Sequence, residues 1–345
     1  MAKYYYGGQA VVEGVMMRGR HSVAVAVRKP EGDISLYEEK LSARLYQNAL
    51  FRLPFFRGVL MLWEMLGLGS RMMTLSANVA AGADDPAPVL SDVTPAIVVS
   101  QEAADTRKSQ VTVMQIQESP QTGKATFVLT LVVSLAFAVA IFFVGPLLLT
   151  SVLHRQIGDG WLSLIIEGVI RLALLLGYLK LIGQVPDIQR VFGYHGAEHK
   201  AINAMEHGEP LDVEHVRQAS RVHTRCGTGF LLLVMVVSIV VFALVGSPTL
   251  LLKIVSRILL VPVVAAIAYE LMRLGAANYR FRIVRWLLAP GLALQGLTTR
   301  EPDAGMMECA IVALECVMAR DRESDGMPGT SVSTPISSPL VTSLE

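Results

Sequence analysis

The class of fold follows from residues 228–272, TGFLLLVMVVSIVVFALVGSPTLLLKIVSRILLVPVVAAIAYELM. The stretch consists of two long apolar runs that meet at Ser247-Pro248. A helix needs about 20 apolar residues to cross a bilayer, and each run supplies that length. We therefore expect two membrane-spanning helices, over residues 228–246 and 249–272, joined as a tight hairpin.

Two earlier runs, residues 125–150 and 161–182, are long and apolar enough to be further spans. The whole chain of 345 residues is 52% hydrophobic and only 17% charged, which is too apolar for an ordinary soluble domain. Its net charge of +1 gives no basic field for nucleic acid. We expect a mainly α-helical integral membrane protein with about four transmembrane helices, whose principal partner is the lipid bilayer.

Lysine and arginine are unevenly distributed between these runs. Residues 183–227 contain five of them, whereas residues 151–160 contain only Arg155 and the turn between the last two runs contains none. Positive residues favour the cytoplasmic side. The distribution predicts a multi-pass protein of the plasma or inner membrane, with both termini and a histidine-rich helical loop, residues 183–227, in the cytoplasm. The N-terminus does not resemble a cleaved signal.

A small polar region precedes the spans. Residues 22–29 and 34–40 alternate in polarity around the turn Pro30-Glu31-Gly32-Asp33, which predicts a β-hairpin, and residues 10–17 favour an additional strand. Residues 51–73 are apolar nearly all round with scattered arginines. They suit an interfacial helix, with a fifth membrane segment as the alternative. This N-terminal region is taken as residues 1–79.

The remaining boundaries follow from composition. Residues 80–123 lack sustained periodicity and favour a flexible linker, and residues 319–345 are rich in Ser, Pro and Thr and favour a disordered tail. Residues 124–318 form the expected membrane domain. Within it, residues 287–297 are too short to cross a bilayer and favour a surface or re-entrant segment. Residues 306–318 predict a short helix with Cys309 and Cys316 on its apolar face, as packing residues.

Some charged residues fall inside the expected spans. Glu167 and Arg171 are four residues apart, which predicts a pair that satisfies itself and fixes helix packing, with a conduction or substrate role as the alternative. Lys253 and Arg257 are expected to extend outward to the membrane surface. Glu270 is open to two interpretations, as a pair with Arg273 or as a carboxylate ligand.

The stretch GYHGAEHKAI, residues 193–202, contains H-x-x-E-H. On a helix, His195 and His199 lie one turn apart on one face, the spacing that lets two imidazoles bind one ion. Glu198 can reach a water on that ion and act as a general base. Glu206 continues the same face as a carboxylate ligand or supporting partner. The simpler interpretation is a polar helix whose histidines bond lipid phosphates or backbone.

A second pair follows at His223-x-x-Cys226, in a glycine-containing turn before the third span. Two histidines with His223 and the Cys226 thiolate would make a closed tetrahedral zinc site. If Cys226 is not a ligand, a position stays open for chemistry. The glycine-rich residues 7–19 predict a tight turn between strands, from which Glu13 could approach the site.

Five stretches together resemble the YqhQ-like family of bacterial membrane proteins, which has a domain of unknown function and is described as predicted metal-dependent enzymes. They are GGQAVVEGVMMRG, RLPFFRGV, YHGAEHKAI, HTRCGTGF and LQGLTTREPD, in this order. The resemblance covers most of the chain outside residues 80–123 and the tail. It implies an integral membrane protein with a metal site at His195, Glu198 and His199, extended by His223 and Cys226. It supplies no reaction.

Three functions are compatible with these features. The first is a membrane-bound zinc-dependent hydrolase acting at the cytoplasmic face on a membrane protein, peptide or lipid headgroup. The second is a non-enzymatic assembly or regulatory protein with a structural zinc site. The third, a transporter using Glu167 and Arg171, is the weakest because four spans with few internal charges offer little pathway in a monomer. The sequence leaves the metal's identity and a homo-oligomer open.

Overall fold

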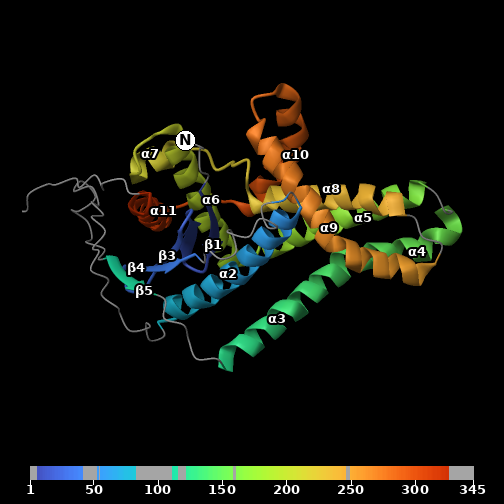
Figure 1. The fold of residues 1–345 in the computed structure, drawn as a ribbon, viewed down its shortest axis with the longest axis horizontal. Helices are drawn as coiled ribbons and strands as arrows, with labels where there is room; N and C mark the ends of the chain where they lie inside the picture. The colour runs from blue at the N-terminus through green and yellow to red at the C-terminus, as the bar shows by residue number, and fades with distance from the viewer. Residues whose placement is uncertain are drawn as a thin grey trace, which may run out of the picture.

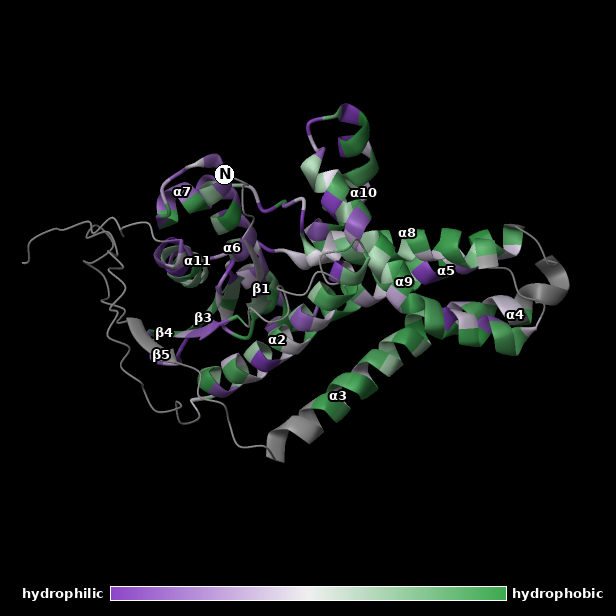
Figure 2. Cartoon of the chain, in the orientation of Figure 1, coloured by the Kyte–Doolittle hydropathy of each residue, from purple (hydrophilic) through white to green (hydrophobic). Residues whose placement is uncertain are grey.

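The structure is a computed structural model that describes residues 6–41, 53, 55–82, 111–115, 122–157, 161–245 and 249–325. Figure 1 shows two adjoining parts, a sheet covered by helices and a group of long helices that extends away from it. The hydropathy colours of Figure 2 separate the two parts, because the long helices are almost continuously apolar. Residues 326–345, most of the predicted tail, lie outside the described residues.

The sheet has five strands in the order of the sequence. They are β1 (Gly7–Val11), β2 (Gly14–Arg18), β3 (Ser22–Arg28), β4 (Ile34–Lys40) and β5 (Val111–Gln115). The predicted hairpin is confirmed as β3 and β4, which pair antiparallel with Arg28 opposite Ile34. Residues 10–17 contribute to two strands instead of one, because the chain reverses at Val12-Glu13 and Glu13 adopts a positive φ of 51°.

Strand β5 lies inside the stretch predicted to be a flexible linker, so that prediction is wrong for residues 111–115. The strand pairs parallel to the edge strand β4, with Ile34 opposite Val111. The sequence VTVMQ is too short to show a clear alternation of polar and apolar residues. It forms a strand because the edge of β4 offers backbone groups for pairing. Residues 83–110 and 116–121 of the same stretch lie outside the described residues.

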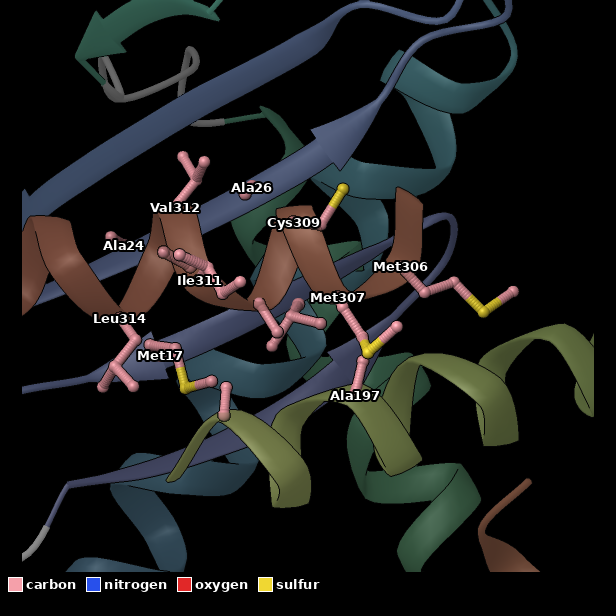
Figure 3. Close-up of a cluster of buried hydrophobic side chains, with 14 of the residues drawn as sticks. Met17, Ala24, Ala26, Ala197, Met306, Met307, Cys309, Ile311, Val312 and Leu314 are labelled. Atoms are coloured by element: carbon pink, nitrogen blue, oxygen red, sulfur yellow. The ribbon is translucent and has the colours of Figure 1, made fainter. Parts of the chain in front are cut away.

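Helices cover both faces of the sheet. Helix α2 (Phe56–Ala80) packs against one face, on Val23, Val25 and Val27. Helices α6 (Pro186–His207) and α11 (Ala304–Ser324) pack against the other face, where β3 presents Ala24 and Ala26. The strict alternation of valine and alanine follows from the two-residue period of a strand. Figure 3 shows α11 lying directly over Ala24 and Ala26, close enough that small side chains suit this face.

Helix α2 also joins the sheet to the long helices. At its start, Arg57 Nε donates to Glu270 Oε1 at 2.7 Å in α9 (Leu250–Ala277). Glu270 therefore pairs with Arg57, and neither with Arg273 nor with the histidine cluster as the sequence suggested. Trp63 stays exposed on the outer face of α2, as an interfacial helix requires. Among the described residues, α2 is not one of the four helices that are long and apolar enough to cross a membrane.

Four described helices are long and apolar enough to span a membrane, and their bounds agree with the predicted spans within a few residues except at the C-terminal end of the fourth. They are Val128–Val152, Leu162–Ile182, Gly227–Leu244 and Leu250–Ala277. The first is continuous through α3 (Thr122–Val139), a π-helical turn η3 (Ala140–Val144) and α4 (Gly145–Ile157). The others are α5 (Trp161–Ile182), α8 (Gly227–Val245) and α9. Residues 246–248 of the hairpin turn lie outside the described residues.

A buried polar network holds these four helices together. The predicted pair in α5 is confirmed, with Arg171 Nη2 donating to Glu167 Oε1 at 2.7 Å. Arg257 of α9 donates to the other carboxylate oxygen of Glu167 at 3.2 Å and is only 3% exposed. The expectation that Arg257 extends outward is therefore wrong, because a buried carboxylate on the neighbouring helix attracts it inward. Arg171 also reaches Ser238 of α8 and the carbonyl of Phe142 in η3.

Helix α10 (Arg282–Thr298) contains the segment predicted to lie at the surface or to re-enter the membrane. It is one helix through Pro290 and runs across the direction of α5 and α8 (Figure 1). Trp286 is 75% exposed near its beginning, while Leu294 and Gln295 are buried near its end. The contact with α8 is close at Gly229, where a Cβ would lie 3.7 Å from the carbonyl oxygen of Gly291.

The predicted role of the two C-terminal cysteines is confirmed by their burial. Cys309 and Cys316 lie in the core between α11 and the sheet, 0% and 5% exposed. Burial raises the pKa of each thiol to about 12, so neither forms a thiolate at neutral pH. Helix α11 continues to Ser324 and so includes the first residues assigned to the tail.

Replacing Glu315 of α11 with Gln should stabilise the protein only at neutral and alkaline pH. Burial raises the pKa of Glu315 from 4.5 to about 7, so the stability that its protonated form provides is present below pH 4.5 and is lost as the pH rises through 7. We expect thermal unfolding in detergent to show a gain of about 1–3 kcal/mol at pH 8 and none at pH 4.5. Exposed Glu31 is the control, and a Glu315→Gln gain equal at both pH values would contradict the argument.

Candidate metal centre

Helix α6 carries the H-x-x-E-H stretch and is buried on nearly every side. It begins with Pro186 at its first turn and ends at Gly208, whose positive φ of 78° closes the helix in the left-handed conformation. From Phe192 to Ala204 all residues but His195 are buried. A helix this buried carries polar side chains only where they have hydrogen-bond partners. For α6 those partners are backbone carbonyls of the segments packed around it.

Three neighbouring polar side chains of α6 bind the backbone carbonyls of residues 217–222. His199 Nδ1 lies 2.6 Å from the Arg221 oxygen. Lys200 Nζ donates to the carbonyls of Arg217 and Ala219, and Asn203 Nδ2 to those of Ser220 and Val222. Carbonyls that lack a helix or sheet partner are costly when buried, and these bonds satisfy them. The segment that leads to Cys226 is therefore fixed on α6.

The first histidine is held in the same way from the other side. His195 Nδ1 lies 2.9 Å from the carbonyl oxygen of Thr298, at the end of α10. A carbonyl can only accept, so Nδ1 carries the proton in both His195 and His199, and Nε2 keeps its lone pair. This is the tautomer and the backbone support that metal-binding histidines use.

The two Nε2 atoms converge with the sulfur of Cys226. His195, His199 and Cys226 place their ligand atoms within 4.8 Å of one another, and Cys226 Sγ lies 3.3 Å from His195 Nε2. Tetrahedral zinc, with bonds of about 2.0–2.3 Å, separates neighbouring ligand atoms by roughly 3.3–3.8 Å. The donor types and their spacing therefore fit zinc with small side-chain adjustments. His195 is 18% exposed at its side chain, which gives the group contact with solvent.

Glu198 lies beside this group, as the helical spacing predicts. Its Oε2 atom is 3.9 Å from His195 Nε2 and 3.8 Å from His199 Nε2. These distances are too long for direct hydrogen bonds, so the carboxylate lies beside the imidazoles without bonding to either Nε2 atom. The residue is 4% exposed, so a proton accepted there would be held away from bulk solvent.

The other two predicted ligands lie nearby and outside the three-residue group. The ring of His223 is 5.6 Å from that of His199 between centroids, but its Nε2 atom lies 3.2 Å from Arg225 Nη2. Glu206 forms an ion pair with Arg225 and lies 3.8 Å from His223. Burial works against the charge on Glu206, yet His223 and Arg225 keep the pKa of this carboxyl below its usual value.

Glu13, which the sequence placed as a possible neighbour of the site, is held elsewhere. Arg190 of α6 binds both of its carboxylate oxygens and lowers its pKa, and Tyr194 OH approaches at 3.3 Å. Strand β1 approaches the site at Gly8 instead, where an added Cβ would lie 2.7 Å from Cγ of Glu198. The glycine-rich N-terminal stretch thus makes space for the Glu198 side chain.

Several residues that build the site carry no ligand spacing and were missed in the sequence. Lys200 and Asn203 are among them, and so is Gln295, whose amide donates to the His223 carbonyl at 2.7 Å and accepts from the His223 N–H at 2.9 Å. One signal was present, since HKAIN places polar residues at positions 199, 200 and 203 of a helix rich in alanine and glycine. Gln295 gives no such signal.

A family described as "Protein of unknown function (DUF1385)" matches residues 53–320. The protein printed as "Uncharacterized protein YqhQ", from Bacillus subtilis (strain 168), is 32% identical over 309 residues, which cover 89% of this chain and 90% of that protein. No solved structure matches. The matched region includes α6, Cys226 and the end of α10.

Gly196→Ala should disrupt the centre through the backbone. A Cβ at this position would lie 2.1 Å from the carbonyl oxygen of Arg300, so residues 298–300 must move and carry the Thr298 carbonyl away from His195. We expect a loss of about 1–3 kcal/mol in unfolding free energy, typical of overpacking. Gly67→Ala in α2 is the control, since no atom lies within 4 Å of its added Cβ. Equal stability of the two variants would show that the contact is not tight.

Proposed function

The chain belongs to the DUF1385 family of proteins of unknown function, and we propose from the chemistry of its site that it is a membrane-bound, zinc-dependent hydrolase acting at the cytoplasmic face. The family name assigns no reaction, so the proposal depends on the geometry around α6. The observation that carries it is the convergence of two imidazole Nε2 atoms and one thiol beside a buried carboxylate.

The proposed location follows from where the polar elements lie relative to the four apolar helices. The sheet, α6 and α11 gather at one end of the long helices (Figure 2). The segments at this end carry the concentration of lysine and arginine that favours the cytoplasm. A site in this position faces substrates at the membrane surface, and we propose a membrane protein, a peptide or a lipid headgroup.

Each residue has a role in the proposed reaction. His195, His199 and Cys226 would hold the zinc ion, which when bound supplies Lewis-acid activation of water and of a carbonyl or phosphoryl group. Glu198 accepts the proton of the attacking water at Oε2 and returns it to the leaving group. The carbonyls of Thr298 and Arg221 keep both imidazoles oriented. His223 is occupied by Arg225 and Glu206, which supports a position open to substrate.

A structural zinc site in an assembly or regulatory protein is the second candidate, and Cys226 favours it. The residue directly precedes α8, so a zinc ion on Cys226 and α6 would fasten the cytoplasmic layer to the span hairpin. His223 would complete a closed set if Arg225 released it. Glu198 separates the two candidates, because a structural site has no need of a base.

Glu198→Gln should retain zinc and abolish function. The amide keeps the size of the side chain but cannot accept a proton at neutral pH. We expect one zinc per chain by elemental analysis in wild type and in Glu198→Gln, loss of zinc in His195→Ala, and no rescue of a strain lacking the gene by either variant. A fully functional Glu198→Gln would exclude catalysis by this carboxylate. Zinc absent from folded wild-type protein prepared without chelators would exclude both metal proposals.

Cys226→Ser should change the spectrum of the cobalt-substituted protein. A thiolate ligand gives cobalt a sulfur charge-transfer band, and serine oxygen gives none. We expect that band in wild type and in the control Cys309→Ala, whose thiol is buried between α11 and the sheet, and its absence in Cys226→Ser. Zinc affinity should fall by at least about 100-fold in Cys226→Ser, since losing only a partner that supports a ligand already costs about 10- to 100-fold. A band that survives in this variant would remove Cys226 from the ligand set.

A further inference from the structure

A second site lies next to the histidine cluster, at the end of the spans. A cavity of about 480 Å³ opens between the C-terminal end of α5, the end of α10 and the segment that follows α10. Its lining includes Leu179, Lys180, Arg221, Leu297, Arg300 and Glu301. Small-molecule sites are typically about 300–1,000 Å³, so the cavity has the size of a ligand site.

The lining combines positive charge with apolar surface. Lys180, Arg221 and Arg300 contribute three positive charges against the single carboxylate of Glu301. That carboxylate is shared, since Arg221 Nε lies 3.1 Å from one of its oxygens and buried Lys200 Nζ 2.8 Å from the other. Within the described part of the chain no carboxylate pairs with Lys180 or Arg300. The cavity therefore attracts an anion.

The cavity lies at the end of the spans, and this position indicates which kind of anion can reach it. Lys180 stands in the last turn of α5, two residues before the end of the span Leu162–Ile182. Helix α10 runs across the direction of α5 and α8 (Figure 1). Trp286 and Leu287 near its beginning are exposed, as are Arg282 and Arg285. Exposed tryptophan and arginine at the end of spans are typical of the headgroup layer. A ligand here reaches the cavity from the membrane surface.

We propose that this cavity binds the phosphate of an anionic phospholipid. Lys180 and Arg300 contact the phosphate oxygens, because ammonium and guanidinium groups form charge-assisted bonds with phosphate. Leu179 and Leu297 contact the glycerol and the first acyl carbons, which a soluble phosphate lacks. The proposal goes beyond the proposed hydrolase and does not need zinc. The two sites share Arg221, whose side chain lines the cavity while its carbonyl accepts from His199.

Lipid binding by the full-length purified protein tests the proposal. The probes are short-chain phosphatidylglycerol, phosphatidylcholine of the same chain length and inorganic phosphate, each titrated in mild detergent by thermophoresis. We expect phosphatidylglycerol to bind more tightly than the other two. Equal binding of phosphatidylcholine would show that net charge is not recognised, and equal binding of inorganic phosphate would show that the site takes a soluble anion. Either result would overturn the lipid assignment.

Variants locate the binding in this cavity. Lys180 is exposed and makes no described side-chain bond, so Lys180→Gln should fold normally and weaken phosphatidylglycerol binding by about fivefold. Lys180→Arg should bind like wild type. The matched control is Arg273→Gln, which removes one exposed charge at the same end of the spans, outside the cavity. A loss in Lys180→Gln no greater than in Arg273→Gln would overturn the proposal. Zinc content should be unchanged in all three, which separates this outcome from any failure of the metal proposal.

Discussion

The hydrogen bonds from α6 side chains to backbone carbonyls are the interactions on which the rest of the centre depends. His199, Lys200 and Asn203 bind five carbonyls within residues 217–222, and His195 binds the carbonyl of Thr298. These bonds bring Cys226 and the end of α10 to one helix. They also place the protons of both histidines on Nδ1, so the Nε2 lone pairs face each other and the thiol. The same contacts therefore fix both the tautomers of the two histidines and the position of the segment that carries Cys226.

This arrangement requires that α6 be buried, and both ends of the chain contribute to burying it. The N-terminal sheet and the C-terminal helix α11 form the core in which α6 lies. Asp321 of α11 accepts from the backbone N–H groups of Arg20 and His21, which fastens α11 to the sheet across about 300 residues of sequence. Arg57 and Glu270 then join this layered part to the spans. The cytoplasmic layer proposed above is thus assembled around α6.

Among the described residues, the buried polar groups within the apolar helices and those around α6 differ in how their hydrogen-bonding capacity is satisfied. Within the spans, Glu167 neutralises one of two arginines, and Ser238 and the Phe142 carbonyl take further guanidinium donors. The partners there are the opposite charges and acceptors that stabilise helix packing. Around α6, two imidazole nitrogens and a thiol, all able to accept, lie within 4.8 Å of one another, and the Glu198 carboxylate lies beside them. An arrangement of acceptors facing acceptors suits a cation.

Apolar length and helical or strand period are local properties. The sequence alone therefore predicts the four membrane-length helices, the β3–β4 hairpin and the shared face of His195, Glu198 and His199. The partners of the charged residues depend on the tertiary structure. Arg257 turned inward to Glu167, Glu270 paired with Arg57, and Glu206 paired with Arg225, although spacing alone allowed other roles. Strand β5 formed because β4 offered a free edge. Ion pairs and strand pairing form with the groups that the fold brings close. Those groups come from residues far apart in the sequence, so local patterns do not reveal them.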